Sequence, residues 1–401
     1  MPFSMLFALS VLCVAIVAAA CPSSPGQYHD ALHNYMTTTF ASRQYFYIGG
    51  QYINHNLPTS NTTGQYMVGQ IYVEHLIPPS VTKTNPIVLI HGNAQSGTNF
   101  LNTPDGREGW TSYLLRAGYE VYITDQAARG RSPYLPGHDG NLTAFSTQQI
   151  ESLFTAPEKQ RPLPYPQAAG HSQWPGEGIV GDPIFDGFYA SQLQTLTNGT
   201  LQASYNNASY TALLEKIGMP SFVFTHSQSG PWGFQLADTV PHLVQGLVSM
   251  EPQGPPFQNW EGPPFVQGYS TTGGLRRYGV SPLPLHYHPP LENDDASLLR
   301  TEVVPARDSY SADCIRQAEP ARRLVNLAQV PHLLLTGEAS YHDVYDHCTV
   351  EYMRQAGVEV DFISLGDVGI HGNGHFIFLE KNSLEVLEQV VLPWLETRSK
   401  H

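Results

Sequence analysis

Two serines separated by a glutamine follow a short apolar run in the stretch "SFVFTHSQSG" at 221–230. A serine hydroxyl attacks a carbonyl only when a base removes its proton, and a sharp turn from a strand into a helix is one way to expose it. With Ser227 as the nucleophile, small residues stand two positions before and two positions after it. With Ser229, Pro231 takes the second of these positions. Ser227 is therefore the favoured nucleophile, and the alternative is that it only caps the next helix.

A serine nucleophile also needs a base, and the base needs an acid that orients it. His375 lies in the glycine-flanked loop of "GIHGNGHFIFLEKN", just before the expected last helix, and His371 competes with it. Glu251 ends the run "GLVSME" 24 residues after Ser227, which leaves room for one helix and one strand. Glu251 is the favoured acid, and Asp343 in "GEASYHD" is the alternative.

Two backbone N–H groups are candidates for binding the oxyanion that forms during acyl transfer. One belongs to Gln228, directly after the expected nucleophile. The other belongs to Asn93 in "LIHGNAQSG", where a His-Gly pair follows an apolar run. The alternative for the second segment is an ordinary glycine turn.

The elements that must position these residues alternate between strand and helix, which predicts an α/β sheet of about eight strands. A hairpin opens it, so the sheet is mixed at its start and parallel afterwards. In such sheets ligands bind beyond the carboxyl ends of the strands. Expected strands lie at 45–53, 65–76, 86–92, 120–125, 221–226, 246–251, 331–337 and 358–366, and expected helices at 108–119, 211–218, 228–240, 343–357 and 382–397. In the last helix, Asn382 and Glu385 have the spacing of a capping box.

Two segments, 131–210 and 252–325, interrupt this alternation and are rich in proline, glycine and aromatic residues. We expect a single domain over 21–401 in which both segments form a cap over the site. Their aromatic side chains suggest a closed apolar pocket for a compact or cyclic ester. These residues are Tyr134, Phe145, Phe154, Trp174, Phe185, Tyr189, Phe257, Trp260, Phe265 and Tyr269.

The first 20 residues are mostly apolar and end in "AAA" before Cys21, as a secretory signal peptide does. An N-terminal anchor is the alternative. Secretion agrees with four glycosylation acceptor triplets, at Asn61, Asn141, Asn198 and Asn207. In an oxidising compartment Cys314 and Cys348 are expected to form a disulfide, and two buried thiols are the alternative.

Composition limits the partners. The formal net charge is −14 and no basic run is present, which argues against nucleic acid. The 17 histidines match no known metal-ligand spacing, so we expect no metal and no cofactor. The expected partner is a small-molecule ester, with no stable membrane insertion once the signal is removed, and a homodimer is compatible with the sequence.

These motifs resemble the α/β-hydrolase superfamily over nearly all of the mature chain. Within it, the chain is similar to secreted bacterial and fungal esterases whose acid is a glutamate after the sixth strand. The matching segments are "VLIHGNAQSGTNFLNTPDGREGW", "VYITDQAARGRSPY", "THSQSG", "SMEPQGPPF" and "GNGHFIFLEKN". The resemblance implies Ser227, Glu251 and His375 as a catalytic triad, with oxyanion N–H groups from Asn93 and Gln228. Asn93 and Ala94 stand where bacterial members can have two cysteines, so properties tied to that disulfide are not transferred.

The sequence therefore predicts a secreted, glycosylated serine esterase that works through an acyl-enzyme. An acyltransferase or lyase on the same fold is one alternative, because exclusion of water would pass the acyl group to an alcohol. A catalytically inactive binding module is another.

Overall fold

The structure is a computed structural model, and it describes residues 40–58, 62–260, 269–270 and 276–399. The predicted signal peptide, Cys21, Asn61 and Phe265 lie outside these residues. Within these ranges, no helix combines the length and the apolar character needed to cross a bilayer.

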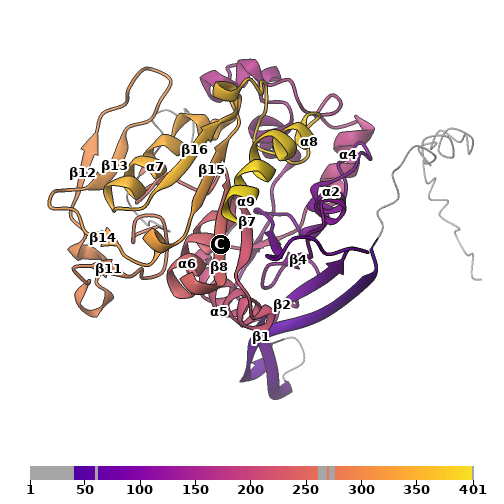
Figure 1. Cartoon of the computed structure of the whole chain (residues 1–401), viewed down its shortest axis with the longest axis vertical. Coiled ribbons are helices and arrows are strands. Elements are labelled where there is room, and N and C mark those ends of the chain that lie inside the picture. The colour runs from indigo at the N-terminus through magenta and orange to yellow at the C-terminus, as the bar shows by residue number, and fades with distance from the viewer. Residues whose placement is uncertain (1–39, 59–61, 261–268, 271–275, 400–401) are drawn as a thin grey trace, which may run out of the picture. The chain divides into compact units, whose positions relative to one another are not determined.

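Eight strands form the central sheet in the order β1-β2-β4-β3-β7-β8-β15-β16 (Figure 1). The pairs β1–β2 and β2–β4 are antiparallel, and every later pair is parallel. The predicted mixed sheet of eight strands is thus confirmed. The strands are β1 (Ser42–Leu57), β2 (Thr62–Ile77), β3 (Ile87–Ile90), β4 (Val121–Asp125), β7 (Ser221–His226), β8 (Val244–Met250), β15 (His332–Thr336) and β16 (Val360–Ser364).

The central strand β7 shows why its sequence is an unbroken apolar run. Side chains alternate between the two faces of a strand. Phe222 and Phe224 pack into one hydrophobic cluster, while Val223 packs into the other on the opposite face. Because helices cover both faces, the strand has no solvent-facing side and lacks polar alternation.

The longer helices include α5 (Gly199–Ile217), which packs against β1, β2 and α6 (Gly230–Thr239). The other helices are α2 (Trp110–Arg116), α3 (Thr147–Ile150), α4 (Pro183–Ala190), α7 (Asp346–Gln355), α8 (Ser383–Val386) and α9 (Leu392–Arg398). A π-helical turn joins α8 to α9, so the predicted last helix is present. Its predicted capping box is wrong, because the Asn382 side chain pairs with Asn373 instead of capping the helix.

Short two-stranded ribbons occupy the two predicted cap segments. They pair β5 (Leu142–Thr143) with β6 (Thr195–Leu196), β9 (Asn259–Trp260) with β10 (Tyr269–Ser270), β11 (Tyr287–His288) with β14 (Arg323–Leu324), and β12 (Thr301–Val304) with β13 (Cys314–Gln317). The cap boundaries themselves stay a prediction.

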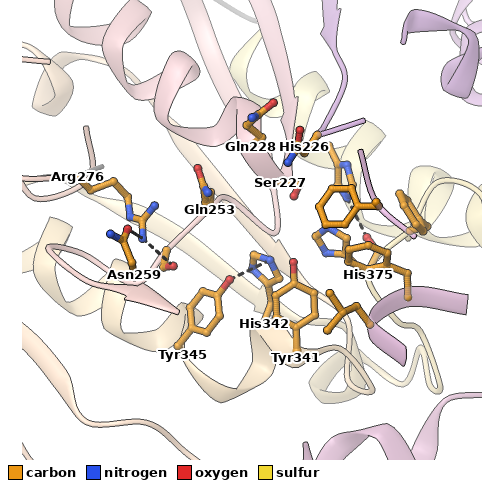
Figure 2. Close-up of a pocket in the computed structure, with 16 residues that line it drawn as sticks. His226, Ser227, Gln228, Gln253, Asn259, Arg276, Tyr341, His342, Tyr345 and His375 are labelled. Atoms are coloured by element: carbon orange, nitrogen blue, oxygen red, sulfur yellow. Dashed lines mark hydrogen bonds between the residues drawn. The ribbon is translucent and has the colours of Figure 1, made fainter. Parts of the chain in front are cut away.

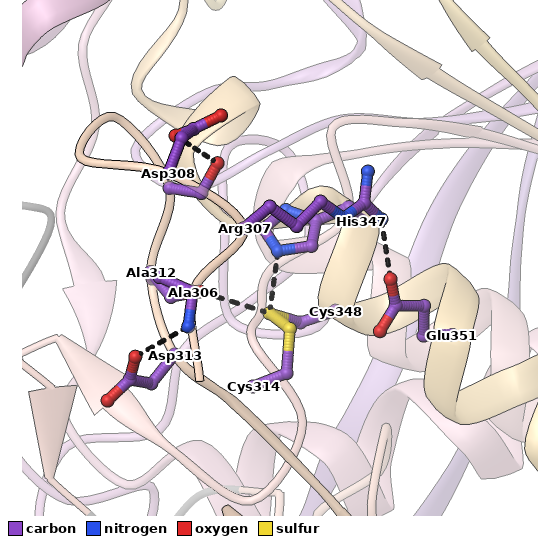
Figure 3. Close-up of a disulfide and its surroundings, with 10 residues drawn as sticks. Ala306, Arg307, Asp308, Ala312, Asp313, Cys314, His347, Cys348 and Glu351 are labelled. Carbon is purple, nitrogen blue, oxygen red and sulfur yellow. Dashed lines mark hydrogen bonds and ion pairs between the residues drawn. A yellow bond between two sulfur atoms is a disulfide. The ribbon is translucent and has the colours of Figure 1, made fainter. Parts of the chain in front are cut away.

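A disulfide joins Cys314, the first residue of β13, to Cys348 in α7 (Figure 3). The predicted pairing is therefore present, and it ties the second cap segment to a helix that packs against β16 of the central sheet. Of the acceptor asparagines, Asn141 and Asn198 are exposed, whereas Asn207 is half-buried and accepts a hydrogen bond from Thr239. Glycosylation stays a prediction at all of them.

Candidate active site

Ser227 occupies a tight turn between β7 and α6, as the sequence predicts for a nucleophile. Its φ is 54°, a left-handed conformation that L residues with a side chain rarely adopt. The turn brings the start of α6 and the segment after β8 so close that a Cβ on Gly230 would lie 2.4 Å from the Cβ of Pro252. Packing therefore leaves no room for a side chain at Gly230, three residues after Ser227.

The two serines of the turn differ in what their hydroxyls do. Ser229 is fully buried; its Oγ accepts from the His226 N–H at 2.8 Å and donates to the carbonyl of Ile90 at 2.9 Å. Ser229 thus caps the turn. In the part of the chain that the structure describes, the Ser227 hydroxyl has no hydrogen-bonding partner, and it lines a cavity.

Glu251 and His375 are joined directly, although 124 positions separate them in the chain. His375 Nδ1 lies 2.5 Å from Glu251 Oε2. The carboxylate also accepts from the Gly337 N–H and from the Ser340 hydroxyl, each at 2.7 Å. Three segments therefore meet at this carboxylate, namely the end of β8, the loop after β15 and the loop of His375, and Nε2 of His375 is left for the cavity.

The competing residues lie elsewhere. His371 is exposed, and its Nδ1 lies 3.1 Å from Glu338. The carboxylate of Asp343 accepts a hydrogen bond from Gln167 at 3.2 Å. The structure thus brings Glu251, not Asp343, to the imidazole of His375.

The protonation of this pair follows from its burial. Burial, with the neighbouring His226 and His342, holds the pKa of His375 well below its ordinary value, so the imidazole is neutral at neutral pH. Burial raises the pKa of Glu251 to about 8, while hydrogen bonds from Ser340 and Gly337 act in the opposite direction. Burial thus opposes a charge on either group, and the 2.5 Å contact between Glu251 Oε2 and His375 Nδ1 requires a proton between these two atoms.

A cavity of about 320 Å³ opens onto Ser227 and His375 (Figure 2). Of the aromatic residues expected over the site, Phe145 and Phe154 line it, and Phe154 stacks on the His375 ring with centroids 5.0 Å apart. Trp174 and Phe185 instead belong to the hydrophobic core. The cavity is lined by Asn93, Phe145, Leu153, Phe154, His226, Ser227, Gln228, Gln253, Gly254, Asn259, Arg276, Tyr341, His342, Tyr345, His375 and Phe376.

Both candidate oxyanion residues, Asn93 and Gln228, lie in this lining. The Asn93 side chain accepts from the N–H of Ala94, whose φ of 56° marks a strained turn. Arg129 contacts the loop of Asn93 and the residue after Ser227. Its guanidinium donates to the Gly92 carbonyl at 3.4 Å and to the Gln228 side chain at 3.3 Å. The "DQAARGRS" motif thus holds the loop that carries Asn93.

A buried ionic contact connects the first cap segment with the histidine loop. The ring of His171 lies between Glu158, at 2.8 Å, and Glu380, at 3.2 Å. Glu380 also accepts from the N–H of Gly374, the residue before His375, at 2.9 Å. Hydrogen bonds to these carboxylates outweigh burial and raise the pKa of His171 to about 9. The charged His171 therefore ties the cap to the loop of the expected base.

Three basic residues of the site were not predicted from the sequence. His226 lies 2.9 Å, through Nε2, from the carbonyl of His375. His342 stacks on the His375 ring, and Arg276 lies in the opposite wall of the cavity (Figure 2). The position of His226 directly before the nucleophile was the one available signal, whereas Arg276 comes from a cap segment without periodicity.

Metal ligation has one geometric candidate at this site. Ligand atoms of Glu251, His342 and His375 lie within 4.8 Å of one another. However, Glu251 and His375 already bond to each other, and both nitrogens of His342 have partners, Asp346 and Tyr345 at 3.0 Å each. The absence of a metal therefore stays the prediction made from the sequence.

Comparisons with known proteins agree with this geometry. A sequence profile of the alpha/beta hydrolase fold matches residues 85–267. The "probable secreted lipase phiG" of Fungal sp. (strain ATCC 74256) is 42% identical over 396 residues, which cover 99% of each chain. A structure described as that of a novel bacterial esterase is similar with a TM-score of 0.59 at 21% identity, over 90% of this chain and 97% of the other. The chain therefore belongs to the alpha/beta hydrolase superfamily.

Proposed function

We propose that this protein is a secreted serine carboxylic-ester hydrolase with Ser227, Glu251 and His375 as its triad. The observation that carries the proposal is the 2.5 Å contact between Glu251 and His375, at the rim of the cavity that Ser227 lines. The name of the fungal relative supports both the secreted location and the lipase or esterase type of activity.

In this mechanism, His375 Nε2 takes the proton of Ser227 Oγ while the oxygen attacks the ester carbonyl. Backbone N–H groups of Gln228 and Asn93 stabilise the tetrahedral oxyanion. The protonated His375 then gives its proton to the leaving alcohol, and water repeats the sequence on the acyl-enzyme. Glu251 keeps the proton of the imidazole on Nδ1 and stabilises its charged form.

The cavity supports a small substrate. About 320 Å³ accommodates a compact molecule. The wall beside His375 is apolar, with Phe154 and Phe376 in contact with its ring. We therefore propose a compact or cyclic ester or lactone as the substrate class.

The test is hydrolysis of 4-nitrophenyl acetate and butyrate by the purified secreted protein. We expect turnover that Ser227→Ala and His375→Gln abolish. His371→Gln is the matched control, because this histidine lies in the same loop but points to solvent. Normal folding without turnover would favour the binding module, and ester products formed with added alcohols would favour an acyltransferase.

A further inference from the structure

Arg276 is a buried cation in the wall of the proposed active-site cavity. Only 2% of its surface is exposed. Backbone carbonyls hold its guanidinium: Nε donates to Pro255 at 3.1 Å, and Nη2 donates to Gly254 at 3.1 Å and to Gln258. These partners fix the plane of the group, but they carry no formal charge.

The positive charge of Arg276 lacks a counter-ion in the described parts of the chain. No described carboxylate forms an ion pair with it, and its Nη1 has no hydrogen-bond acceptor there. Burial lowers the pKa of Arg276 only to about 10, so the group is charged at neutral pH. Burying an unpaired charge is costly, and an anion bound beside it would offset that cost.

The cavity as a whole has the electrostatics of an anion site. Among the lining residues that the structure describes, Arg276 carries the formal positive charge, and none is an aspartate or a glutamate. Gln253 and Asn259 lie beside Arg276 in Figure 2, whereas Ser227 and His375 lie together across the cavity. The cavity therefore has a reaction side with apolar walls and a polar side with an unpaired guanidinium.

We propose that the ester substrate carries a carboxylate, which binds Arg276 while the ester carbonyl lies at Ser227. The inference rests on the proposed function for the position of the ester. Nη1 of Arg276 supplies the N–H groups that no described acceptor uses, and a hydrogen bond between a charged donor and a carboxylate is a strong one. The substrate class is thus a compact ester with a free acid group on its acyl or alcohol side.

The experiment compares charged and neutral esters of the same shape. One pair is 4-acetoxybenzoate with 4-acetoxybenzamide, and the other is mono-4-nitrophenyl adipate with the corresponding adipamide ester. We expect kcat/KM to favour the carboxylate in at least one pair by about 10- to 100-fold, the range of a hydrogen bond to a charged group. In Arg276→Gln this ratio should fall to about one, and Arg276→Lys should keep part of it.

The ratio is measured on one preparation at a time, so partial misfolding of a variant does not change it. Arg277→Gln is the matched control, because this neighbouring arginine is exposed and lies over the Tyr278 ring. It should keep the wild-type ratio. Hydrolysis of both members of each pair at equal kcat/KM would overturn the carboxylate site and leave the esterase proposal intact.

A second measurement separates the two proposals if no ester is cleaved. We expect 4-hydroxybenzoate to raise the melting temperature of the wild-type protein more than 4-hydroxybenzamide does. Arg276→Gln should remove that difference. Such a result without turnover would contradict the esterase and support the anion site, whereas equal shifts with both ligands would contradict the anion site.

Discussion

The imidazole rings of His342 and His375 stack with their centroids 4.9 Å apart and their planes at 15°. His342 is fixed in this position by Asp346 on one nitrogen and by the Tyr345 hydroxyl on the other. A proton added to His375 would therefore place a charge against a second buried ring. With burial and the nearby His226, this arrangement lowers the pKa of His375.

The first prediction concerns the acidic limb of the pH–rate profile. A base with a lowered pKa stays unprotonated, and so active, until the pH falls below that pKa. We expect kcat/KM for 4-nitrophenyl acetate to decline only below the ordinary histidine value of about 6.5. His342→Gln removes one group that disfavours the protonated form of His375, so the midpoint of the acidic limb should move to higher pH.

His371→Gln serves as the control for this shift, because the exposed His371 does not contact the site. A wild-type midpoint above the ordinary histidine value would contradict the lowered pKa. An unchanged midpoint in His342→Gln would assign the lowered pKa to burial and His226.

The identity of the acid provides the second prediction. In Glu251→Gln the side-chain amide cannot hold the imidazole in the required tautomer, so kcat should fall by about 10³- to 10⁴-fold. Asp343→Asn should change kcat only a few-fold, because Asp343 contacts Gln167 rather than His375. Steady-state kinetics of both variants decide which residue is the catalytic acid. A large loss of kcat in Asp343→Asn alone would assign that role to Asp343 instead of Glu251.

The site illustrates which features a sequence can and cannot reveal. The spacing from Ser227 to Glu251 was readable because one helix and one strand fill it, and parallel strands end at the same edge of a sheet. The partner of the Asn382 side chain could not be predicted from the sequence, because the amide of Asn373, nine residues earlier, competes for it.

Arg276 and His342 were missed for a related physical reason. Neither role follows from the local sequence pattern: Arg276 depends on carbonyls of the 254–258 turn in its own cap segment, and His342 depends on the ring of His375 from a distant loop. Cap segments follow no repeating strand or helix pattern that would place their side chains in advance. The eight-stranded sheet was predictable because hydrophobic periodicity reports its burial directly.

The disulfide provides the third prediction. Cys314 and Cys348 are 34 positions apart, and closing a loop of this length stabilises the folded chain by about 3–4 kcal/mol in the chain-entropy model. Cys314→Ala/Cys348→Ala should lower the free energy of unfolding in urea by about this amount. Because the bond lies outside the cavity lining, kcat/KM of the folded variant should stay near wild type.

Reduction of the wild-type protein is the matched comparison for that double variant. It should lower the unfolding midpoint to a similar extent, and the reductant should leave the variant unchanged. An equal midpoint for variant and wild type would show that the bond contributes nothing to stability.

The fourth prediction follows from His171 between its two carboxylates. Its pKa in the folded protein, about 9, lies above the ordinary value of 6.5. A raised pKa stabilises the fold fully below the unfolded pKa, and this stabilisation is lost as pH rises from about 6.5 through about 9. The shift corresponds to about 3 kcal/mol as an order of magnitude.

Urea unfolding of wild type and His171→Gln at pH 6 and pH 9.5 measures this term. The free energy of unfolding of the variant should be lower than that of wild type at pH 6, and this difference should shrink at pH 9.5. His286→Gln is a suitable control, because His286 also pairs with a carboxylate, Asp238, but is largely exposed. A constant difference between wild type and His171→Gln at both pH values would contradict a charged His171.

The fifth prediction tests the strain at the nucleophile. Ser227 adopts a φ of 54°, which costs a residue with a Cβ about 1 kcal/mol or more and costs glycine little. Ser227→Ala and Ser227→Gly should both lack esterase activity, yet Ser227→Gly should be more stable than Ser227→Ala by about 1 kcal/mol. Thermal and urea unfolding measure the stability of the two variants, neither of which turns over substrate. Because the hydroxyl is absent from both, equal stabilities would mean that this turn stores no strain, and that the exposed position of the Ser227 hydroxyl depends on packing alone.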